Sequence, residues 1–380
     1  MKFLPLFAFA LGLCTWAGAS VADDQCGGIP GQRISGRPEN KQVPTYATLK
    51  FPGDLIAVRA PPLRVNSDGG KSSYIFKKGE QRPDLGFSYL SDGVDRWVPN
   101  PPGLRGKSEG KRYPCDKSCE KDLLDAAGMD FGPGTKEFCA FGFEVGPGAP
   151  SCGDGNSVIG NGKGKPLLRQ VGNTPTAVLS VDGKTELLPY LSTTSIKHPE
   201  NGALVYLDAE SVPFLVTTDR NLFGHIAWVG GPGLHGTWAV FADSGHFGEG
   251  SIALHQYLLY NRIIPQAPGH LPAEMRCKKQ KKEPEFDPPF GSAPDIKNDF
   301  CKDVHSSVTG GTNVRANTGL DHVEMMIFAG EPKFSLNSSK DHALETVTKE
   351  SIDAKMKGHE EQVTAIVTCL RNVKAAKPAR

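Results

Sequence analysis

The sequence lacks an excess of charge of either sign. It carries 43 Lys and Arg against 42 Asp and Glu over 380 residues, which gives a formal net charge of +1. Removal of an N-terminal segment that contains Lys2, predicted below, changes this value to 1 − 1 = 0. A protein that binds nucleic acid mainly through charge needs a large basic surplus. We therefore expect no nucleic acid among its partners.

Long apolar runs are also missing, apart from a short one at the N-terminus. There Lys2 precedes the apolar stretch Phe3–Leu13, and small residues follow at 17–19 and 20–22. A positive start, a short apolar stretch and an A-x-A site are typical of a secretory signal peptide, which we place at residues 1–19. The stretch is shorter than the roughly 20 residues that span a bilayer. We therefore expect a secreted, extracellular protein with no membrane partner.

Long uninterrupted helical patterns are rare, because 44 Gly and 30 Pro break the chain. This composition excludes a coiled coil and a long helical bundle. Short apolar segments between turn residues predict β-strands within 46–98, including one at 86–90, and again within 177–242. Helical spacing follows Ser251, and one long amphipathic helix is predicted over 341–373.

These patterns suggest how the chain is organised after the signal peptide. Residues 20–45 are interpreted as an extended lead-in, and residues 46–264 as the main β domain. A Cys-rich insertion at about 99–165 is predicted to form stapled loops with one short helix near 120–127. Residues 265–380 are predicted to form a Pro- and Lys-rich connector, a strand and the C-terminal helix, packed on the core.

Cysteine is well represented. One of the nine cysteines lies in the predicted signal peptide, and the other eight are an even number, which predicts disulfides in an exported chain. Eight cysteines allow about 105 pairings, and the sequence does not choose among them. Cys115 and Cys119 have C-x₃-C spacing, but they lack a second, similarly spaced pair, which disfavours zinc. His225, His235 and His246 also lack metal-ligand spacing, so no metal and no other cofactor is expected.

Two carboxylates lie six positions apart between regular elements. A predicted strand ends at Asp243, a Gly-rich loop carries Glu249, and a predicted helix begins near Ser251. Hydrolysis of a glycosidic bond needs one carboxylic acid that protonates the leaving oxygen and one carboxylate that activates water. A turn-forming Asp and a surface Glu are the alternative interpretation. The flanking residues do not complete a serine-hydrolase motif.

Five segments of the chain share motifs with one known family. Phe241–Gly245 and Gly248–Leu254 resemble its signature, a strand ending in Asp-x-Gly-Pro followed by Gly-Glu-(Gly/Ala)-Ser-Ile-(Ala/Ser)-Leu. Three upstream segments resemble further motifs of that family, in the same order: residues 66–70, 190–195 and 206–216. On these motifs the chain resembles glycoside hydrolase family 75, the secreted endo-chitosanases of fungi and some bacteria. The Cys-rich insertion and the chain after the main domain have no counterpart there.

The resemblance implies a mainly β fold, with a double-psi β-barrel-like core in residues 46–264, peripheral loops and a C-terminal α-helix. It implies inverting hydrolysis of the β-1,4 bonds of chitosan or a related amino-sugar polysaccharide. Asp243 and Glu249 become the catalytic pair, with Glu249 as the general acid. Because chitosan is cationic, further carboxylates are expected in the cleft. The candidate substrate-binding residues in the family-like segments are Asp68, Asp208, Tyr206 and Thr194.

One feature departs from the family pattern. Only His246 and Phe247 separate Gly245 from Gly248, so the loop is short, and His246 replaces a proline. An inverting pair needs carboxyl groups roughly 6.5–9.5 Å apart, which requires this loop to fold back. The alternative prediction is a catalytically silent barrel that acts as a secreted wall-glycan-binding or interaction protein. A related barrel enzyme that acts on a different glycan is a third possibility.

Overall fold

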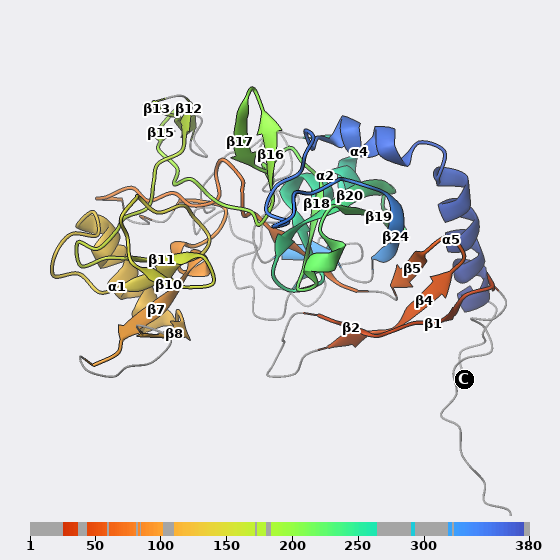
Figure 1. The fold of residues 1–380 in the computed structure, drawn as a ribbon, viewed down its shortest axis with the longest axis horizontal. Coiled ribbons are helices and arrows are strands. Elements are labelled where there is room, and N and C mark those ends of the chain that lie inside the picture. Colours follow the sequence, from red (N-terminus) through yellow and green to blue (C-terminus); the bar gives the residue numbers. More distant parts are fainter. Residues whose placement is uncertain are drawn as a thin grey trace, which may run out of the picture.

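The computed structural model describes most of the chain. The described residues are 26–36, 44–58, 61–80, 83, 85–101, 110–171, 173–179, 184–263, 290–292, 318–320 and 323–375. The predicted signal peptide and both Cys277 and Cys301 lie outside these residues. The described part is mainly β with helices at its C-terminal end, as the sequence predicts. It forms two lobes side by side in Figure 1, a large lobe built on an eleven-stranded sheet and a small lobe comprising residues 90–166.

The large lobe is built on one curled sheet (Figure 1) whose strands come from distant parts of the chain. The C-terminal part supplies β24, which lies inside the sheet between β5 and β19. The strands in spatial order are β1 (Ile29–Pro30), β4 (Thr48–Phe51), β5 (Leu55–Val58), β24 (Glu324–Lys333), β19 (His225–Gly230), β20 (Thr237–Ser244), β18 (Phe214–Thr217), β21 (Glu249–Ser251), β6 (Leu63–Asn66), β23 (Thr318–Leu320) and β22 (Phe290–Ser292).

Parallel pairing occurs at two places in this otherwise antiparallel sheet. Strand β18 runs parallel to β20, and β21 runs parallel to β6. Because β18 also pairs with β21, it lies between the strand that ends near Asp243 and the strand that begins at Glu249. Val216 pairs with Asp243 on one side, while Leu215 pairs with Gly250 on the other. The register therefore places Asp243 and Glu249 on opposite sides of β18.

Helices cover both faces of this sheet, and strand periodicity decides which side chains they meet. Successive side chains of a strand point to opposite faces. In β20, Trp238 and Val240 pack in the cluster that contains Ile352 and Val363 of the C-terminal helices. Ala239 and Phe241 pack instead with Leu254 and Leu258. The apolar strands are thus buried on both faces, which explains their continuous apolar runs.

The helices of the large lobe begin and end at capping residues. Helix α2 (Ile252–Tyr260) follows Ser251, whose side chain accepts a hydrogen bond from the Leu254 N–H, and it ends at Asn261 in a left-handed conformation.

The prediction of one helix over 341–373 is wrong. Two helices are present instead, α4 (Lys349–Met356) and α5 (Glu360–Ala375).

Local sequence explains this break. Thr348 caps α4 through a hydrogen bond accepted from the Ser351 N–H, so the helix begins late. Gly358 lies between α4 and α5 with φ +93°, a conformation that favours glycine. Leu344, predicted on the apolar face of the helix, is 61% exposed, whereas Val347 and Met356 are buried. None of the described helices is long and apolar enough to cross a membrane.

The small lobe corrects the prediction for the Cys-rich insertion. It is not a set of stapled loops, because a five-stranded sheet runs through it with its own core around Leu123 and Phe138. Its strands contain many polar and Gly residues, so they show no continuous apolar run in the sequence. The elements are η2 (Leu90–Gly93), β7 (Val94–Pro99), β8 (Gly110–Pro114), α1 (Lys117–Gly128), β9 (Phe138–Ala140), β10 (Ser151–Gly153) and β11 (Asn156–Ile159), in the sheet order β10-β11-β9-β7-β8.

Short hairpins and turns complete the described structure. The predicted strand at 86–90 is absent, since these residues form bends that lead into η2. The paired short strands are β2 (Ile34–Ser35) with β3 (Thr45–Tyr46), β12 (Gln170–Val171) with β13 (Thr174–Pro175), β14 (Val178–Leu179) with β15 (Glu186–Leu187), and β16 (Lys197–Glu200) with β17 (Ala203–Tyr206); η3 covers Arg220–Leu222.

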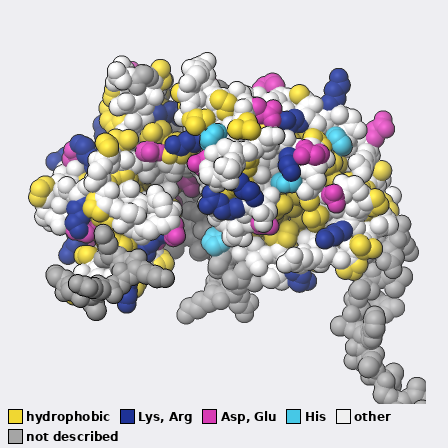
Figure 2. All heavy atoms as spheres, viewed as in Figure 1, with side chains coloured by type: hydrophobic (Ala, Val, Ile, Leu, Met, Phe, Trp, Pro, Cys, Tyr) yellow, Lys and Arg dark blue, Asp and Glu magenta, His cyan; other side chains and the backbone are white. Residues whose placement is uncertain are grey.

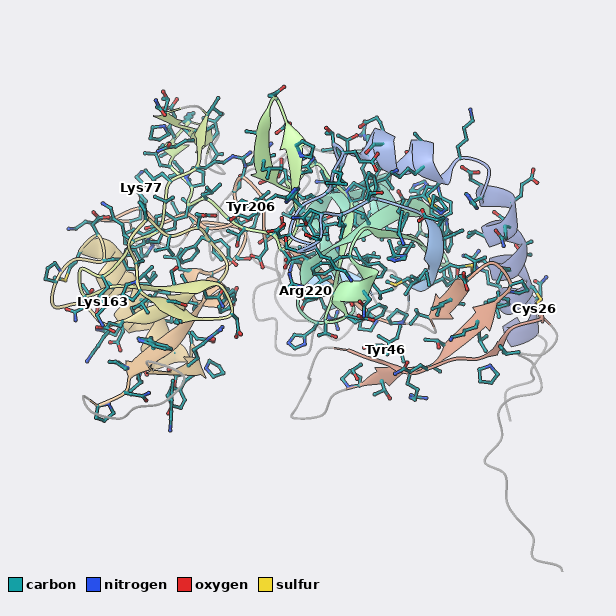
Figure 3. The ribbon with its side chains drawn as sticks, viewed as in Figure 1. Cys26, Tyr46, Lys77, Lys163, Tyr206 and Arg220 are labelled. Atoms are coloured by element: carbon teal, nitrogen blue, oxygen red, sulfur yellow. A yellow bond between two sulfur atoms is a disulfide. The ribbon has the colours of Figure 1, made fainter. Side chains whose placement is uncertain are left out.

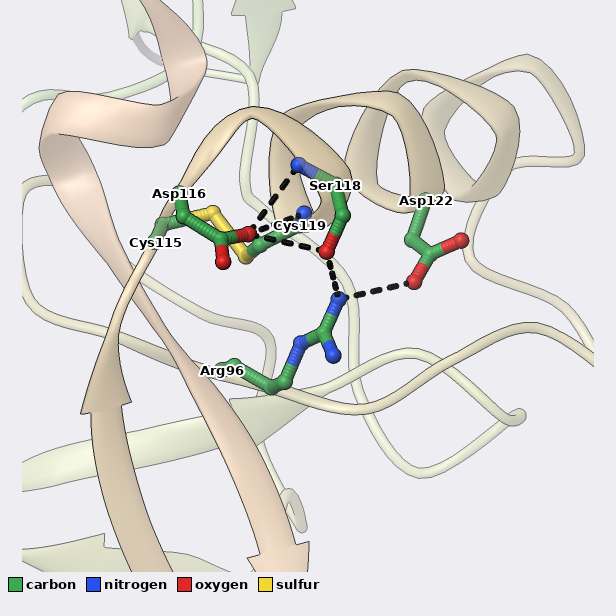
Figure 4. The surroundings of a disulfide bond; sticks show 6 residues. All are labelled: Arg96, Cys115, Asp116, Ser118, Cys119 and Asp122. Carbon is green, nitrogen blue, oxygen red and sulfur yellow. Dashed lines mark hydrogen bonds and ion pairs between the residues drawn. A yellow bond between two sulfur atoms is a disulfide. The ribbon is translucent and has the colours of Figure 1, made fainter.

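Three disulfides confirm the prediction for six of the cysteines. Cys26 and Cys369 join the two ends of the large lobe across a sequence separation of 343 residues. In the small lobe, Cys139 pairs with Cys152. Cys115 pairs with Cys119 at the start of α1 (Figure 4), so these two residues form a disulfide in place of the zinc alternative. Asp116 caps the same helix, accepting hydrogen bonds from the Ser118 and Cys119 N–H groups.

Candidate functional site

A cleft of about 960 Å³ lies where the two lobes meet, and both lobes line it. Tyr206 and Arg220 mark its large-lobe side in Figure 3, and acidic side chains are visible at the junction in Figure 2. The charged lining is mostly acidic: carboxylates come from Asp68, Asp92, Asp95, Glu144, Asp154, Asp243 and Glu249, and guanidinium groups from Arg112 and Arg220. This excess of carboxylates favours a cationic ligand.

The short loop between β20 and β21 folds back, as a working carboxylate pair requires. Phe247 is buried and stacks on Phe241 with ring centroids 6.3 Å apart, which anchors the middle of the loop in the core. Gly248 has φ +100°, and a Cβ there would lie 3.0 Å from the Pro62 carbonyl oxygen, so only glycine fits well. A Cβ at Gly245 would lie 3.6 Å from Glu249 Oε2. Glu249 therefore reaches back over the residues that follow Asp243.

Asp243 is the most enclosed of the cleft carboxylates, with 5% of its surface exposed. Its Oδ1 accepts hydrogen bonds from the Ser195 N–H and hydroxyl, both at 2.8 Å, and from the Ser244 N–H at 2.9 Å. Burial raises the pKa of Asp243 to about 6, although these three hydrogen bonds favour the anion. Asp243 is therefore a carboxyl group that holds its proton in mildly acidic solution.

Asp68 joins this pair from a rigid loop after β6. Its carboxylate accepts a hydrogen bond from the Tyr74 hydroxyl at 2.6 Å, and its N–H donates to Asn66 Oδ1 at 2.9 Å. Gly69 has φ +82°, and a Cβ there would lie 2.0 Å from the Leu207 carbonyl oxygen, so the backbone approaches closely at this point. The turn that follows β6 is thereby fixed.

The pKa of Asp68 responds to both of the other carboxylates. Burial raises its pKa well above the usual value, and the negative charges of Asp243 and Glu249 raise it further. The hydrogen bond from Tyr74 opposes this shift. The negative charges of Asp243 and Glu249 therefore both favour the protonated form of Asp68. We call these three residues the carboxylate cluster.

Two further predicted residues line the cleft, but their roles differ. Tyr206 donates a hydrogen bond to Glu144 Oε2 in the small lobe, and burial and this bond raise the pKa of its hydroxyl. Thr194 lines the wall as well, yet its hydroxyl donates to the Ile196 carbonyl at 2.8 Å and accepts from the Leu207 N–H at 3.1 Å. Thr194 therefore ties two backbone segments together.

Asp208 is the predicted site residue that the structure leaves outside the cleft lining. Its carboxylate accepts hydrogen bonds from the Glu210 N–H at 3.0 Å and the Ser211 hydroxyl at 3.2 Å, so it stabilises a turn. Glu210, in that turn, is 5% exposed and accepts a 2.7 Å hydrogen bond from the Ser72 N–H. Burial raises the pKa of Glu210 to about 7. Glu210 thus holds the loop that carries Asp68.

Sequence reasoning missed the residues that the small lobe brings to the cleft. Phe141 and Glu144 lie in the stretch predicted to be stapled loops, and Asp92 follows the segment predicted as a strand at 86–90. No motif singled out any of the three. Ser195 was within reach, because it ends one of the family-like segments and its hydroxyl faces Asp243.

Metal ligation is not apparent in the described residues, where no group of three His, Cys, Asp or Glu side chains has the geometry to hold an ion. His225 is buried and its Nδ1 lies 2.9 Å from the Phe328 carbonyl oxygen, while His246 is exposed on the cleft wall.

The chain matches no protein-family model, and a search of curated proteins finds no match. The chemistry of this site is therefore argued from its geometry.

Proposed function

We propose that the protein is a glycoside hydrolase that cleaves the β-1,4 bonds of chitosan by an inverting acid–base mechanism. The observation that carries the proposal is the carboxylate cluster, in which three carboxyl groups line one cleft and the charges of two act on the third. Glycosidic hydrolysis needs two carboxyl groups in different protonation states. Close carboxylates separate their pKa values, because a second negative charge is disfavoured beside the first.

The protonation states suggest the roles. Burial raises the pKa of Asp243 to about 6, so this residue can act as the general acid in mildly acidic solution. Glu249, across β18 from Asp243, is left to act as the base that activates water. This assignment reverses the one favoured by the sequence, which gave the acid role to Glu249. Asp68 bonds to Tyr74 and stabilises positive charge at the reacting ring.

The substrate class follows from the charge of the cleft. Seven carboxylates against two guanidinium groups line it, and a glucosamine polymer carries an ammonium group on each deacetylated ring. Electrostatic complementarity of this kind concentrates a cationic chain and selects against anionic polysaccharides. We propose chitosan, or a closely related amino-sugar polysaccharide, as the substrate.

A double-psi β-barrel and secretion belong to the same proposal. The two parallel pairs, β18 with β20 and β6 with β21, are the pairings that a barrel of this kind would need at its centre. Secretion agrees with the expected signal peptide and with three disulfides, which persist in oxidising compartments. Thermal unfolding with and without reductant, on protein recovered from the culture medium of an expressing cell, tests the second point.

A silent glycan-binding barrel is the second candidate. The observation in its favour is the enclosure of Asp243, whose Oδ1 already accepts three hydrogen bonds. Release of reducing ends from chitosan by the purified protein decides between the two. A hydrolase releases them at a rate that depends on the carboxylate cluster. A silent barrel binds the polymer, stays folded and releases none.

A further inference from the structure

We propose that the small lobe is the specificity half of the cleft, where Phe141 stacks on a sugar ring and Glu144 binds the ammonium group of a glucosamine unit. This inference rests on the proposed function, because it assumes that an amino-sugar chain occupies the cleft. It goes beyond the resemblance, since the insertion that supplies both residues has no counterpart in the family.

Phe141 lines the cleft, where the Arg112 guanidinium carbon lies 5.8 Å from the centroid of its ring. Its side chain is 37% exposed. Its N–H donates to the Gly93 carbonyl at 2.9 Å, and its carbonyl accepts from the Thr193 hydroxyl at 3.2 Å. The ring is thus carried by a fixed backbone. A pyranose ring has an apolar C–H face that such a surface removes from water.

The backbone of Glu144, three residues after Phe141, is also fixed by hydrogen bonds. Its N–H donates to the Leu191 carbonyl at 2.8 Å, and its carbonyl accepts from the Leu167 N–H at 2.9 Å. Of its carboxylate oxygens, Oε2 accepts from the Tyr206 hydroxyl, while Oε1 has no donor among the described residues. The oriented carboxylate therefore has one oxygen available for a ligand ammonium group.

A primary ammonium group of the protein lies over the ring of Tyr206, the residue that bonds to Glu144. Lys197 Nζ lies 4.2 Å from the centroid of the Tyr206 ring, the ring whose hydroxyl bonds to Glu144. A cation over an aromatic face is attracted by the negative charge of that face. Because Lys197 occupies the face of Tyr206, the second carboxylate oxygen of Glu144 is the group left to receive a ligand ammonium, the charge that distinguishes glucosamine from N-acetylglucosamine.

The charge of the small lobe supports the same ligand. Asp92, Asp95, Glu144 and Asp154 line the cleft from this lobe against a single guanidinium, that of Arg112. Arg112 is committed to two of these carboxylates, lying 2.8 Å from Asp95 and 3.4 Å from Asp154. Glu144 has no ion pair among the described residues.

One segment connects this surface to the carboxylate cluster. Ser192 pairs with Phe143 of the small lobe, and Thr193 N–H donates to the Gly142 carbonyl at 3.1 Å. Ser195, two residues later, bonds to Asp243 Oδ1. A ligand that contacts Phe141 therefore lies along the same short segment as the reacting centre, so binding in the small lobe sets the position of the scissile bond.

Calorimetric titration of the full chain with two oligosaccharides tests the proposal. The probes are a glucosamine hexamer and an N-acetylglucosamine hexamer, and the catalytically blocked Glu249→Gln background prevents turnover. Phe141→Ala is expected to weaken binding of both probes by about three- to tenfold. Glu144→Gln keeps the shape and the bond to Tyr206, and is expected to weaken only the glucosamine hexamer, by about threefold, less at high salt. Matched controls are Tyr113→Ala, an exposed aromatic outside the cleft lining, and Asp125→Asn on α1.

Each outcome separates the two proposals. Wild type that hydrolyses chitosan while Phe141→Ala and Glu144→Gln bind like the controls overturns the small-lobe inference and leaves the hydrolase standing. Binding that depends on Phe141 and Glu144 in a wild type without hydrolysis supports the inference and removes the hydrolase. A glucosamine hexamer that does not bind at all overturns both. If Glu144→Gln weakens the binding of both hexamers equally, the proposed contact between Glu144 and the ammonium group is wrong.

Discussion

The two lobes contribute to the cleft in different ways. The large lobe places Asp243 and Glu249 by strand register, because β18 pairs with β20 on one side and β21 on the other. The small lobe places Phe141 and Glu144 by loops that bond to the segment 190–195. Strand register fixes positions closely and suits reacting groups. Insertions attached through loops change more easily, which suits a surface that selects the ligand.

The sharpest test of this division removes the reacting groups. Asp243→Asn and Glu249→Gln keep size and fold but remove the proton or the charge, so each is expected to reduce chitosan hydrolysis by about 10²–10⁴-fold. Reducing-end release under initial-rate conditions measures the loss. Asp125→Asn, on the exposed surface of α1, is the control and is expected to keep the full rate. A Glu249→Gln variant with undiminished rate would remove Glu249 from the mechanism.

The disulfides offer a comparison of stability. Replacing both Cys26 and Cys369 by Ala opens a link across a sequence separation of 343 and is expected to lower the free energy of unfolding by about 5 kcal/mol. The matched pair of changes at Cys115 and Cys119 opens a separation of 4 and is expected to cost about 2 kcal/mol. Denaturant unfolding measures both. Equal losses would contradict an origin in chain entropy.

The pH profile shows which lobe carries the proton chemistry. If Asp243 is the acid, kcat/KM falls about tenfold per pH unit above its pKa of about 6, because the protonated fraction decreases. Glu144→Gln is expected to leave the midpoint of this limb in place, since its proposed role is to bind ligand away from the reacting bond. Rates on a soluble glucosamine oligomer, taken over about two pH units on either side of the midpoint, measure the midpoints of wild type and of Glu144→Gln. A midpoint that moves in Glu144→Gln would place the proton in the small lobe.

Glu210 gives the smallest expected effect. Its pKa in the fold, about 7, is higher than its usual value of 4.5, so the folded state binds the proton more tightly. The stability from this difference is present below pH 4.5 and is lost as the pH rises through about 7. Glu210→Gln is expected to gain about 1–3 kcal/mol over wild type between acidic and neutral solution. Unfolding of both at two pH values measures the gain, with the exposed Glu361→Gln as the control that shows none.

The sequence allowed the predictions that depend on local pattern. Apolar runs marked β5 and β20, Ser251 marked the start of α2, and the cysteine count indicated disulfides. The motif residues Asp68, Asp243 and Glu249 were predicted for the site, and the structure brings them into one cleft. Asp208 was predicted beside them but stabilises a turn outside the lining, because a motif position does not tell which way its carboxylate points.

The tertiary structure decided what depends on distant contacts. The sheet of the small lobe was not predictable, because strands such as β8 gain their stability from neighbours and carry no apolar run of their own. The C-terminal helix is divided because Thr348 caps α4 and Gly358 adopts a positive φ after it. A search for helical spacing of apolar residues does not detect such single positions. The sequence showed where carboxylates and apolar strand segments occur along the chain. Only long-range pairing, between β18, β20 and β21 and between the two lobes, decided which of those carboxylates meet.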